Sequence, residues 1–338
     1  MDLLRKLLFP FAIVYGLVSA IRNWLYDRKI LKSSTFEIPV IAVGNLSVGG
    51  TGKSPQVEYL IRLLSPKHKI AVLSRGYKRS TKGFVLAGGS ASAENLGDEP
   101  YQFHRKFPEI TVAVDADRAN GIKQLIALMN PDVILLDDAF QHRKVQAGFY
   151  ILLTAYNDLF SDDFILPMGN LRESRDGADR ADCIIVTKCP KTLSAAEMKQ
   201  IRNKIKPNTN QELFFTFIDY EDFVVNETEK IAVSTLRQEK KLLVAGIAKP
   251  KPFFNHLRHD GDMVMEFPDH HAFTDSEIET IKSKAHKHKI VTTEKDYVRL
   301  GRQIPNLFYL PIRSTFLSGG EKFNQIILDY VGKNTTDN

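Results

Sequence analysis

The sequence predicts an α/β protein with a parallel-sheet domain, a smaller second α/β domain and a hydrophobic helix at the N-terminus. Three observations support this prediction. Short apolar runs alternate with helical patterns along most of the chain, which is typical of a parallel sheet covered by helices. A glycine-rich segment near residue 50 separates one such run from a helical pattern. Residues 7–21 carry no charge, and basic residues flank them.

The glycine-rich segment, Val40-Ile-Ala-Val-Gly-Asn-Leu-Ser-Val-Gly-Gly-Thr-Gly-Lys-Ser-Pro55, has the form of a phosphate-binding loop. Its apolar start predicts a buried strand, and the apolar spacing from Val57 to Leu64 predicts a following helix. The backbone N–H groups of such a loop and the helix N-terminus bind phosphate. A serine replaces the first glycine of the usual pattern, and a glycine-rich turn beside a chance Lys-Ser pair is the alternative. We therefore predict a P-loop NTPase-like sheet whose nucleotide-binding residues are Ser47, Val48, Gly49, Gly50, Thr51, Gly52, Lys53 and Ser54.

Two adjacent carboxylates end a second apolar run, Asp132-Val-Ile-Leu-Leu-Asp-Asp138, as in a Walker B strand. Lys53 is expected to reach the β- and γ-phosphates and Ser54 to ligate Mg²⁺. One of Asp137 and Asp138 is expected to hold the same ion, while the other orients water or a substrate group. A solvated turn or a helix N-cap is the alternative for the paired acids alone. Together with the P-loop, they predict magnesium-dependent chemistry on a nucleoside triphosphate.

Functional-looking residues follow several predicted strands, where ligands bind in parallel α/β sheets. They include Arg75 and Tyr77, the stretch from Asp115 to Arg118, and the stretch from Asp137 to His142. The segment Thr187-Lys-Cys-Pro190 lacks the final aspartate of a guanine-reading motif, so adenine is the expected base. The strands predicted for this sheet are Pro39–Val43, Lys69–Leu73, Ile110–Val114, Val133–Leu136, Tyr150–Leu153 and Cys183–Thr187.

The domain boundaries follow from a change in pattern near residue 214. We expect an N-terminal membrane-associating helix at 1–30, the P-loop domain at 31–213, a smaller α/β domain with strand connectors at 214–312, and a C-terminal helix and tail at 313–338. A strand near Leu307–Ile312 is expected to return and pair with Phe214–Ile218. The strands predicted for the smaller domain are Leu242–Gly246, Val264–Phe267, Lys289–Thr292 and Leu307–Pro311.

The composition favours an intracellular enzyme with anionic partners. The chain has 338 residues, of which 43% are hydrophobic and 25% charged, and its formal net charge is +6. Cys183 and Cys189 are too few for a disulfide framework and are expected to be reduced. The positive charge suits nucleotides, phosphorylated substrates or lipid headgroups. No aromatic-basic or zinc-finger pattern predicts nucleic-acid binding, and no obligate protein partner is evident.

The uncharged segment at residues 7–21 is too short to span a bilayer, which takes about 20 apolar residues. Val18-Ser-Ala20 resembles a signal-peptide cleavage site, but Pro10 and Tyr15 interrupt the apolar core, and an exported protein would find little ATP. A core helix packed on the domain is the other alternative. We favour a helix in the membrane interface, with Trp24 and Tyr26 near the headgroups. The expected location is therefore the cytoplasmic face of a membrane, as a peripheral or monotopic protein.

Six motifs follow one another along the chain: the P-loop segment, Ser74-Arg-Gly-Tyr77, Gly97-Asp-Glu-Pro100, Leu136-Asp-Asp-Ala-Phe-Gln-His142, Asp269-His-His-Ala-Phe273 and Thr293-Glu-Lys-Asp296. Together they resemble the tetraacyldisaccharide 4′-kinases, also called lipid A 4′-kinases. The resemblance covers essentially the whole chain, and Ala139 replaces an expected glycine. It implies transfer of the ATP γ-phosphate to the 4′-hydroxyl of a tetraacyldisaccharide 1-phosphate, at the inner face of the bacterial inner membrane, with ATP and Mg²⁺ as cofactors.

The resemblance also assigns roles to single residues. Asp98 is implied as the base for the sugar hydroxyl, and His270 as its partner, with Asp269 beside it. Domain closure is expected to bring Asp98 and His270 together. Without the resemblance, Asp98 would be read as a turn residue and His270 as a surface histidine. Catalytic roles are therefore expected for Asp98, His270, Lys53 and Asp138, phosphate neutralisation for Arg118, and weaker substrate contacts for Arg75, Tyr77, Gln141, His142, Asn170 and Asp269.

A membrane-associated P-loop ATPase that acts as a switch is the rival from another class. The N-terminal segment and the P-loop fit such a protein equally well, but Asp98 and the Asp269-His-His271 motif are then unexplained. A soluble small-molecule kinase or ligase ranks third, because the N-terminal segment disfavours it.

Overall fold

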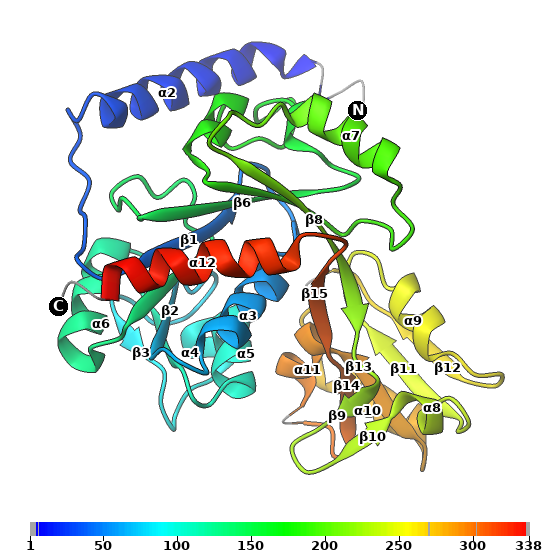
Figure 1. Ribbon diagram of the computed structural model, residues 1–338. Helices are drawn as coiled ribbons and strands as arrows, with labels where there is room; N and C mark the ends of the chain where they lie inside the picture. Colours follow the sequence, from blue (N-terminus) through cyan, green and yellow to red (C-terminus); the bar gives the residue numbers. More distant parts are fainter. Residues whose placement is uncertain (1–4, 6, 270, 302, 336–338) are drawn as a thin grey trace.

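The computed structural model describes residue 5 and residues 7–269, 271–301 and 303–335. Two sheets organise these residues (Figure 1). The larger has nine strands in the order β15-β8-β7-β6-β1-β5-β2-β4-β3, and the smaller has six in the order β10-β9-β14-β13-β11-β12. The mixed α/β architecture confirms the predicted fold class.

The larger sheet is parallel except at its two edges. Strands β1 (Val40–Asn45), β5 (Val133–Asp137) and β7 (Cys183–Thr187) are buried along their whole length, which explains their continuous apolar sequences. The other strands are β2 (Ile70–Ser74), β3 (Val85–Leu86), β4 (Thr111–Val114), β6 (Phe149–Ala155), β8 (Glu212–Tyr220) and β15 (Ile312–Phe316).

Helices on this sheet position the P-loop and the neighbouring turns. Helix α12 (Gly320–Thr335) lies across one face, where Phe323, Ile327 and Val331 join the same apolar cluster as strand β1 and helix α3 (Figure 1). The spacing of these three residues places them on one side of the helix. The other helices of this part are α3 (Lys53–Leu64), α4 (Ala93–Leu96), α5 (Asp98–Lys106), α6 (Arg118–Met129) and α7 (Ala195–Ile205), with 3₁₀ turns at Phe160–Asp162 and Arg175–Arg180.

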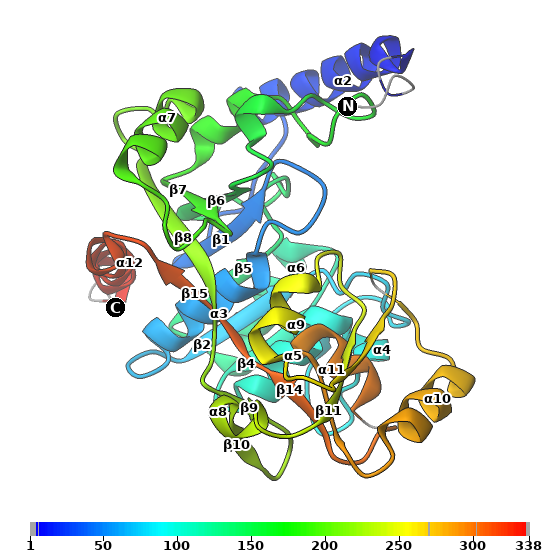
Figure 2. The same cartoon turned by 90° about the vertical axis from the view of Figure 1, so that its right-hand side faces the viewer.

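The smaller sheet forms a separate layer system beside the first one (Figure 2). Its strands β12, β11, β13 and β14 are parallel, and the β9–β10 hairpin extends it antiparallel. The elements are β9 (Phe223–Val225), β10 (Lys230–Ala232), α8 (Val233–Leu236), β11 (Lys241–Ala245), α9 (Lys251–Leu257), β12 (Met263–Glu266), α10 (Asp275–Ala285), β13 (Lys289–Thr293), α11 (Glu294–Leu300) and β14 (Leu307–Leu310).

Two antiparallel strands, β8 and β15, connect the sheets (Figure 1). The register pairs Ile312 with Tyr220 and Phe316 with Thr216. The expected pairing of Leu307–Ile312 with this strand was wrong in its bounds, because β14 pairs with β13 in the smaller sheet. Pro311, a residue that cannot donate to a strand ladder, separates β14 from β15, and only the segment after it joins β8.

The N-terminal helix α2 (Phe9–Asp27) has its large apolar side chains on the outside. Four of the residues turned towards the rest of the protein are small or polar and recur at helical spacing: Ala12, Gly16, Ser19 and Asn23. A Cβ on Gly16 would lie 3.3 Å from Ile165, and Asn23 donates to Glu173 at 2.7 Å. Within the described residues, no helix combines the length and hydropathy that crossing a bilayer requires.

A buried ionic network joins the two sheet systems on the side away from α2. Lys106, at the end of α5, lies 2.7 Å from Glu58 of α3 and also contacts Glu294 at the start of α11. Burial, followed by the neighbouring Glu58, raises the pKa of Glu294 to about 7, although Lys106 opposes this. The Lys106 ammonium group thus lies between two buried carboxyl groups, of which Glu58 also pairs with Arg62 at 3.2 Å.

Lys106→Met should lower the free energy of unfolding by about 3–5 kcal/mol, because it leaves the buried Glu294 without a cation among the described residues and Glu58 with Arg62 alone. The stability linked to the raised pKa of Glu294 is present below its ordinary value of 4.5 and is lost as pH rises to about 7. Removing the cation raises that pKa further, so the loss should be larger at pH 8 than at pH 5.5. Urea titrations at both pH values measure it. Lys322→Met, which breaks an exposed pair with Glu212, is the control and should lower the free energy of unfolding by less than about 1 kcal/mol. If Lys106→Met lost the same free energy of unfolding at both pH values, the role given to Glu294 would be wrong.

Candidate active site

The P-loop connects β1 to α3, as the sequence predicts, and two of its glycines adopt conformations that other residues avoid. Gly49 has φ 113° and Gly52, the N-cap of α3, has φ 82°. The loop is held from outside by Asn170, whose carbonyl accepts from the N–H of Val48 at 2.8 Å. Lys188 donates to the carbonyl of Gly50 at 2.5 Å. Two other segments of the chain therefore contact the loop backbone directly.

Lys53 and Ser54, the first two residues of α3, face the end of strand β5. The Lys53 ammonium lies 3.4 Å from Asn45 Oδ1 and 3.6 Å from Asp138 Oδ1. The Ser54 hydroxyl donates to Glu99 Oε1 at 3.0 Å. These positions agree with a lysine that reaches phosphate and a serine beside a cation site.

Asp137 and Asp138 lie in opposite environments although they are neighbours. Asp137 is buried; its Oδ2 accepts from the Ser74 hydroxyl at 3.0 Å, and its Oδ1 has no partner in the described part of the chain. Burial, followed by the charge of Glu99, raises the pKa of Asp137 to about 7. Burial opposes ionisation of Asp138 as well, but Lys53 and Arg172 outweigh it and hold its pKa below the usual value. Asp137 is thus the carboxylate that most needs a cation.

The oxygen atoms around Asp137 fit Mg²⁺. The Asp137 carboxylate, the Ser54 hydroxyl and Glu99 are hard oxygen donors, which Mg²⁺ prefers. No cluster of three or more His, Cys, Asp or Glu side chains among the described residues could hold a metal ion alone. This agrees with a Mg²⁺ ion that takes one or two protein ligands and completes its shell with water and nucleotide phosphates.

Arg118 and His142 lie behind this site. The Arg118 guanidinium is buried and donates to the carbonyls of Asp115 and Asp137, the latter at 3.1 Å, while its Nε has no partner in the described residues. Burial lowers the pKa of Arg118 to about 10, so it remains charged at neutral pH. Burial, followed by Arg118, lowers the pKa of His142 to about 4 and keeps its imidazole neutral. Neither residue lines the cavity that opens at Asp137 and Asp138.

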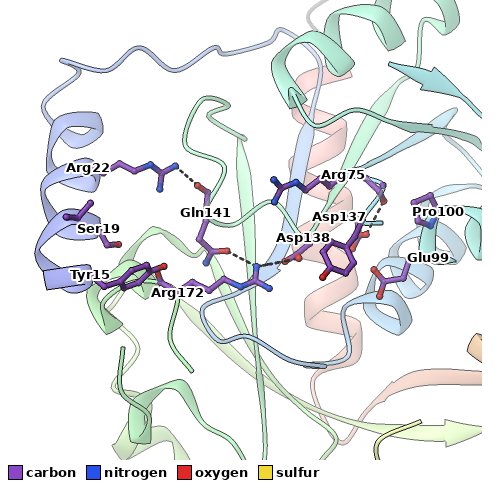
Figure 3. A pocket seen from close by; sticks show the side chains of 14 residues that line it. Tyr15, Ser19, Arg22, Arg75, Glu99, Pro100, Asp137, Asp138, Gln141 and Arg172 are labelled. Carbon is purple, nitrogen blue, oxygen red and sulfur yellow. Dashed lines mark hydrogen bonds and ion pairs between the residues drawn. The ribbon is translucent and has the colours of Figure 1, made fainter. Parts of the chain in front are cut away.

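A cavity of about 480 Å³ runs from the two aspartates to helix α2 (Figure 3). Arg172 links two residues of the cavity wall: the Arg172 Nη1 atom lies 3.2 Å from Asp138 Oδ1 and 3.3 Å from Gln141 Oε1. Arg22 of α2 donates to the Gln141 carbonyl at 3.0 Å, as Figure 3 shows. The wall also includes Tyr15, Val18, Ser19, Ser74, Arg75, Gly76, Tyr77, Glu99 and Pro100.

Asp98 begins helix α5 at the boundary with the smaller sheet. Gly97 precedes it with φ 94°, and Asp98 Oδ2 accepts from Arg299 Nε of α11 at 3.0 Å. The Asp269 side chain is exposed. His270 lies outside the described residues. Asn170, another predicted contact, accepts from Arg5 near the start of α2 and does not line the cavity.

Several residues of the site were missed from the sequence. Glu99 follows Asp98 in the Gly97-Asp-Glu-Pro100 motif, so adjacency was a signal for it. Ser74 ends strand β2 at the same sheet edge and also had a positional signal. Arg172 lies in a segment without a local pattern, and Arg299 lies three residues after the Thr293-Glu-Lys-Asp296 motif. Only the folded chain brings them to Asp138 and Asp98.

The whole chain is similar to known proteins. A family model described as tetraacyldisaccharide-1-P 4′-kinase matches residues 4–332. A tetraacyldisaccharide 4′-kinase of Flavobacterium johnsoniae is 59% identical over 337 residues and 99% of both chains, and one of Bacteroides thetaiotaomicron is 44% identical over 98% of this chain and 94% of that one. A crystal structure of LpxK from Aquifex aeolicus in complex with ATP is similar with a TM-score of 0.80 and 30% identity, over 97% of this chain and 100% of that one. This chain belongs to the tetraacyldisaccharide-1-P 4′-kinase family.

Proposed function

We propose that this chain transfers the γ-phosphate of ATP to the 4′-hydroxyl of a tetraacyldisaccharide 1-phosphate, a step of lipid A biosynthesis. Family membership supports the reaction. The observation that carries it is the cavity, which starts at Asp137 and Asp138 beside the P-loop lysine and ends at the apolar helix α2. A lipid with a sugar headgroup needs this combination of a phosphate site and an apolar surface.

The P-loop residues 47–54 bind the triphosphate through their backbone N–H groups and through Lys53. Ser54 and Asp137 would hold Mg²⁺, with Glu99 and Asp138 close by, and the bound ion would supply positive charge against the phosphate oxygens. Arg118 contributes its buried positive charge from behind Asp137 without touching the cavity. Arg172 and Lys53 keep Asp138 ionised and oriented.

Asp98 accepts the proton of the 4′-hydroxyl as the sugar attacks, and His270, next to Asp269, orients it. Asp98 starts α5, whereas His271, the neighbour of His270 in the sequence, contacts Arg299 of α11 in the smaller sheet system. The proposed pairing therefore depends on how α11 docks against α5. Arg75, Tyr77 and Gln141 line the cavity and contact the headgroup of the lipid. His142 and Asn170 support the cavity from behind, through the segment after β5 and through the P-loop contact.

Helix α2 binds the cytoplasmic surface of the inner membrane as a peripheral or monotopic element. Phe11, Val14 and Leu17 are 65%, 62% and 61% exposed, although a globular protein buries such side chains. Trp24 is also exposed and lies near Arg28, as expected for residues at headgroup level. The net charge of +6 adds attraction to anionic lipid. The proposed activity needs neither nucleic acid nor an obligate protein partner.

The triple variant Val14→Gln/Leu17→Gln/Ile21→Gln should bind anionic phospholipid vesicles more than about tenfold more weakly, because each large apolar side chain contributes about 1.5–3 kcal/mol on full transfer from water. The three residues are exposed and lie on one side of α2. Cosedimentation with vesicles measures the loss.

A matched pair of single variants controls for surface polarity. Leu17→Gln should weaken vesicle binding, whereas Leu128→Gln on α6, a leucine that is 59% exposed, should not. Binding that is unchanged in the triple variant would remove the membrane role from α2.

The proposed reaction is tested by measuring ATP consumption and phosphorylated lipid together, with and without the acyl-disaccharide 1-phosphate. A kinase consumes ATP in proportion to the lipid product. ATP hydrolysis that is independent of lipid, with no phosphorylated product, would instead identify an ATPase switch.

A further inference from the structure

Arg299 connects the two sheet systems at the point where the proposed reaction needs them aligned. It lies on α11 of the smaller sheet system, and its guanidinium contacts Asp98 at the start of α5. Only 15% of the Arg299 side chain is exposed, against 40% for Asp98. The partly exposed Asp98 of the larger sheet system is therefore paired with the more buried Arg299 of the smaller one.

The guanidinium binds Asp98 through a single carboxylate oxygen. Nε donates to Oδ2 at 3.0 Å, and Nη2 donates to the same atom at 2.5 Å. Among the described residues, Oδ1 accepts no hydrogen bond. Because arginine stays protonated, it orients the carboxylate without competing for a substrate proton. The second oxygen is left for the sugar hydroxyl.

The same guanidinium also contacts the loop that carries the Asp269-His-His271 motif. Arg299 Nη1 donates to the carbonyl of His271 at 3.4 Å and lies 3.9 Å from the buried Asp296. Asp296 is itself anchored, since it accepts from Thr293 Oγ1 at 2.7 Å and from Gly246 N at 2.8 Å. Arg299 thus lies beside the anchored Asp296 and contacts both Asp98, the proposed base, and the loop that carries the Asp269-His-His271 motif.

We propose that Arg299 is the positioning residue that aligns Asp98 with the histidine loop when the two sheet systems come together. The inference rests on the proposed function and adds to it a residue that acts through Asp98. In a static ion pair without this role, Arg299 would contribute to stability only.

Arg299→Ala should lower kcat by about 10²-fold, the scale of a small misplacement of a reacting group, while KM for ATP changes less than about threefold. Arg299→Lys keeps the charge but loses the planar fork, so it should recover only part of kcat. In the Asp98→Ala background, Arg299→Ala should cause no further loss, because residues that act as a unit are not additive. ATP binding by calorimetry and the thermal melting temperature check that the variants fold.

Arg105→Ala is the matched control. Arg105 also lies on α5 and pairs across the boundary, with Glu227 at 2.6 Å, but it does not contact Asp98. Its variant should keep kcat within about twofold. A normal or raised kcat in Arg299→Ala would overturn the proposal, as would a loss that multiplies with that of Asp98→Ala. If Asp98→Ala itself is fully active, the base assignment of the proposed function fails instead.

Discussion

Lys53→Ala is expected to lower kcat by about 10²–10³-fold or more while the protein stays folded. The ammonium group stabilises charge that develops as the γ-phosphoryl group leaves, and no other lysine side chain contacts Asp138 among the described residues. Lys53 is largely buried at the first position of α3, where its removal leaves the apolar side of the helix intact. Turnover under saturating ATP and lipid, together with the circular dichroism spectrum, measures the effect.

Lys191→Ala serves as the control for Lys53→Ala. Lys191 is exposed and pairs with Asp219 on the strand that connects the two sheets. Its loss should leave turnover within about twofold, since exposed ion pairs contribute little. Turnover near the wild-type rate in a folded Lys53→Ala protein would show that this loop is not the phosphate site of the reaction.

Asp98→Ala and His270→Ala are each expected to lower kcat by about 10²–10⁴-fold, the range of general acid–base catalysis. The double variant should be little worse than the slower single variant, because the base and its orienting partner act on one proton. Asp98→Asn keeps the shape and removes the basic oxygen, so it should be as slow as Asp98→Ala. ATP binding should persist in all of these variants, because the P-loop does not depend on them.

Two outcomes would contradict the pairing of Asp98 and His270. Effects that multiply in the double variant would mean that the two residues act independently. An Asp98→Asn protein with substantial turnover would mean that the carboxylate positions the substrate and does not take its proton.

The strands and helices of the larger sheet could be predicted because each produces a pattern among neighbouring residues in the sequence. The apolar run Val40–Asn45, the glycines after it and the apolar side of Lys53–Leu64 lie next to each other in the chain, and each pattern reports burial or a special backbone angle. The strand ending at Asp137 was found in the same way. The P-loop and the two aspartates then meet because β1 and β5 are parallel neighbours.

Local sequence patterns do not identify the strand that pairs with β8. Leu307–Leu310 and Ile312–Phe316 are both apolar enough to form strands, and the sequence offers no means to decide which one pairs with β8. The structure assigns them to different sheets on either side of Pro311. Such a choice depends on the packing of whole sheets, which no short segment encodes.

The sequence by itself determined the kind of chemistry: a phosphate loop, paired carboxylates and an apolar N-terminal segment, each defined by neighbouring residues. The tertiary structure decided which charges face each other. Arg299 and Asp98 are separated by 201 positions, and Glu99 lies 45 positions from Ser54. Their pairing follows from how α11 docks on α5 and how α5 lies beside the P-loop helix. Contacts between distant segments arise from burial of the surfaces between them, and that burial is a property of the folded chain alone.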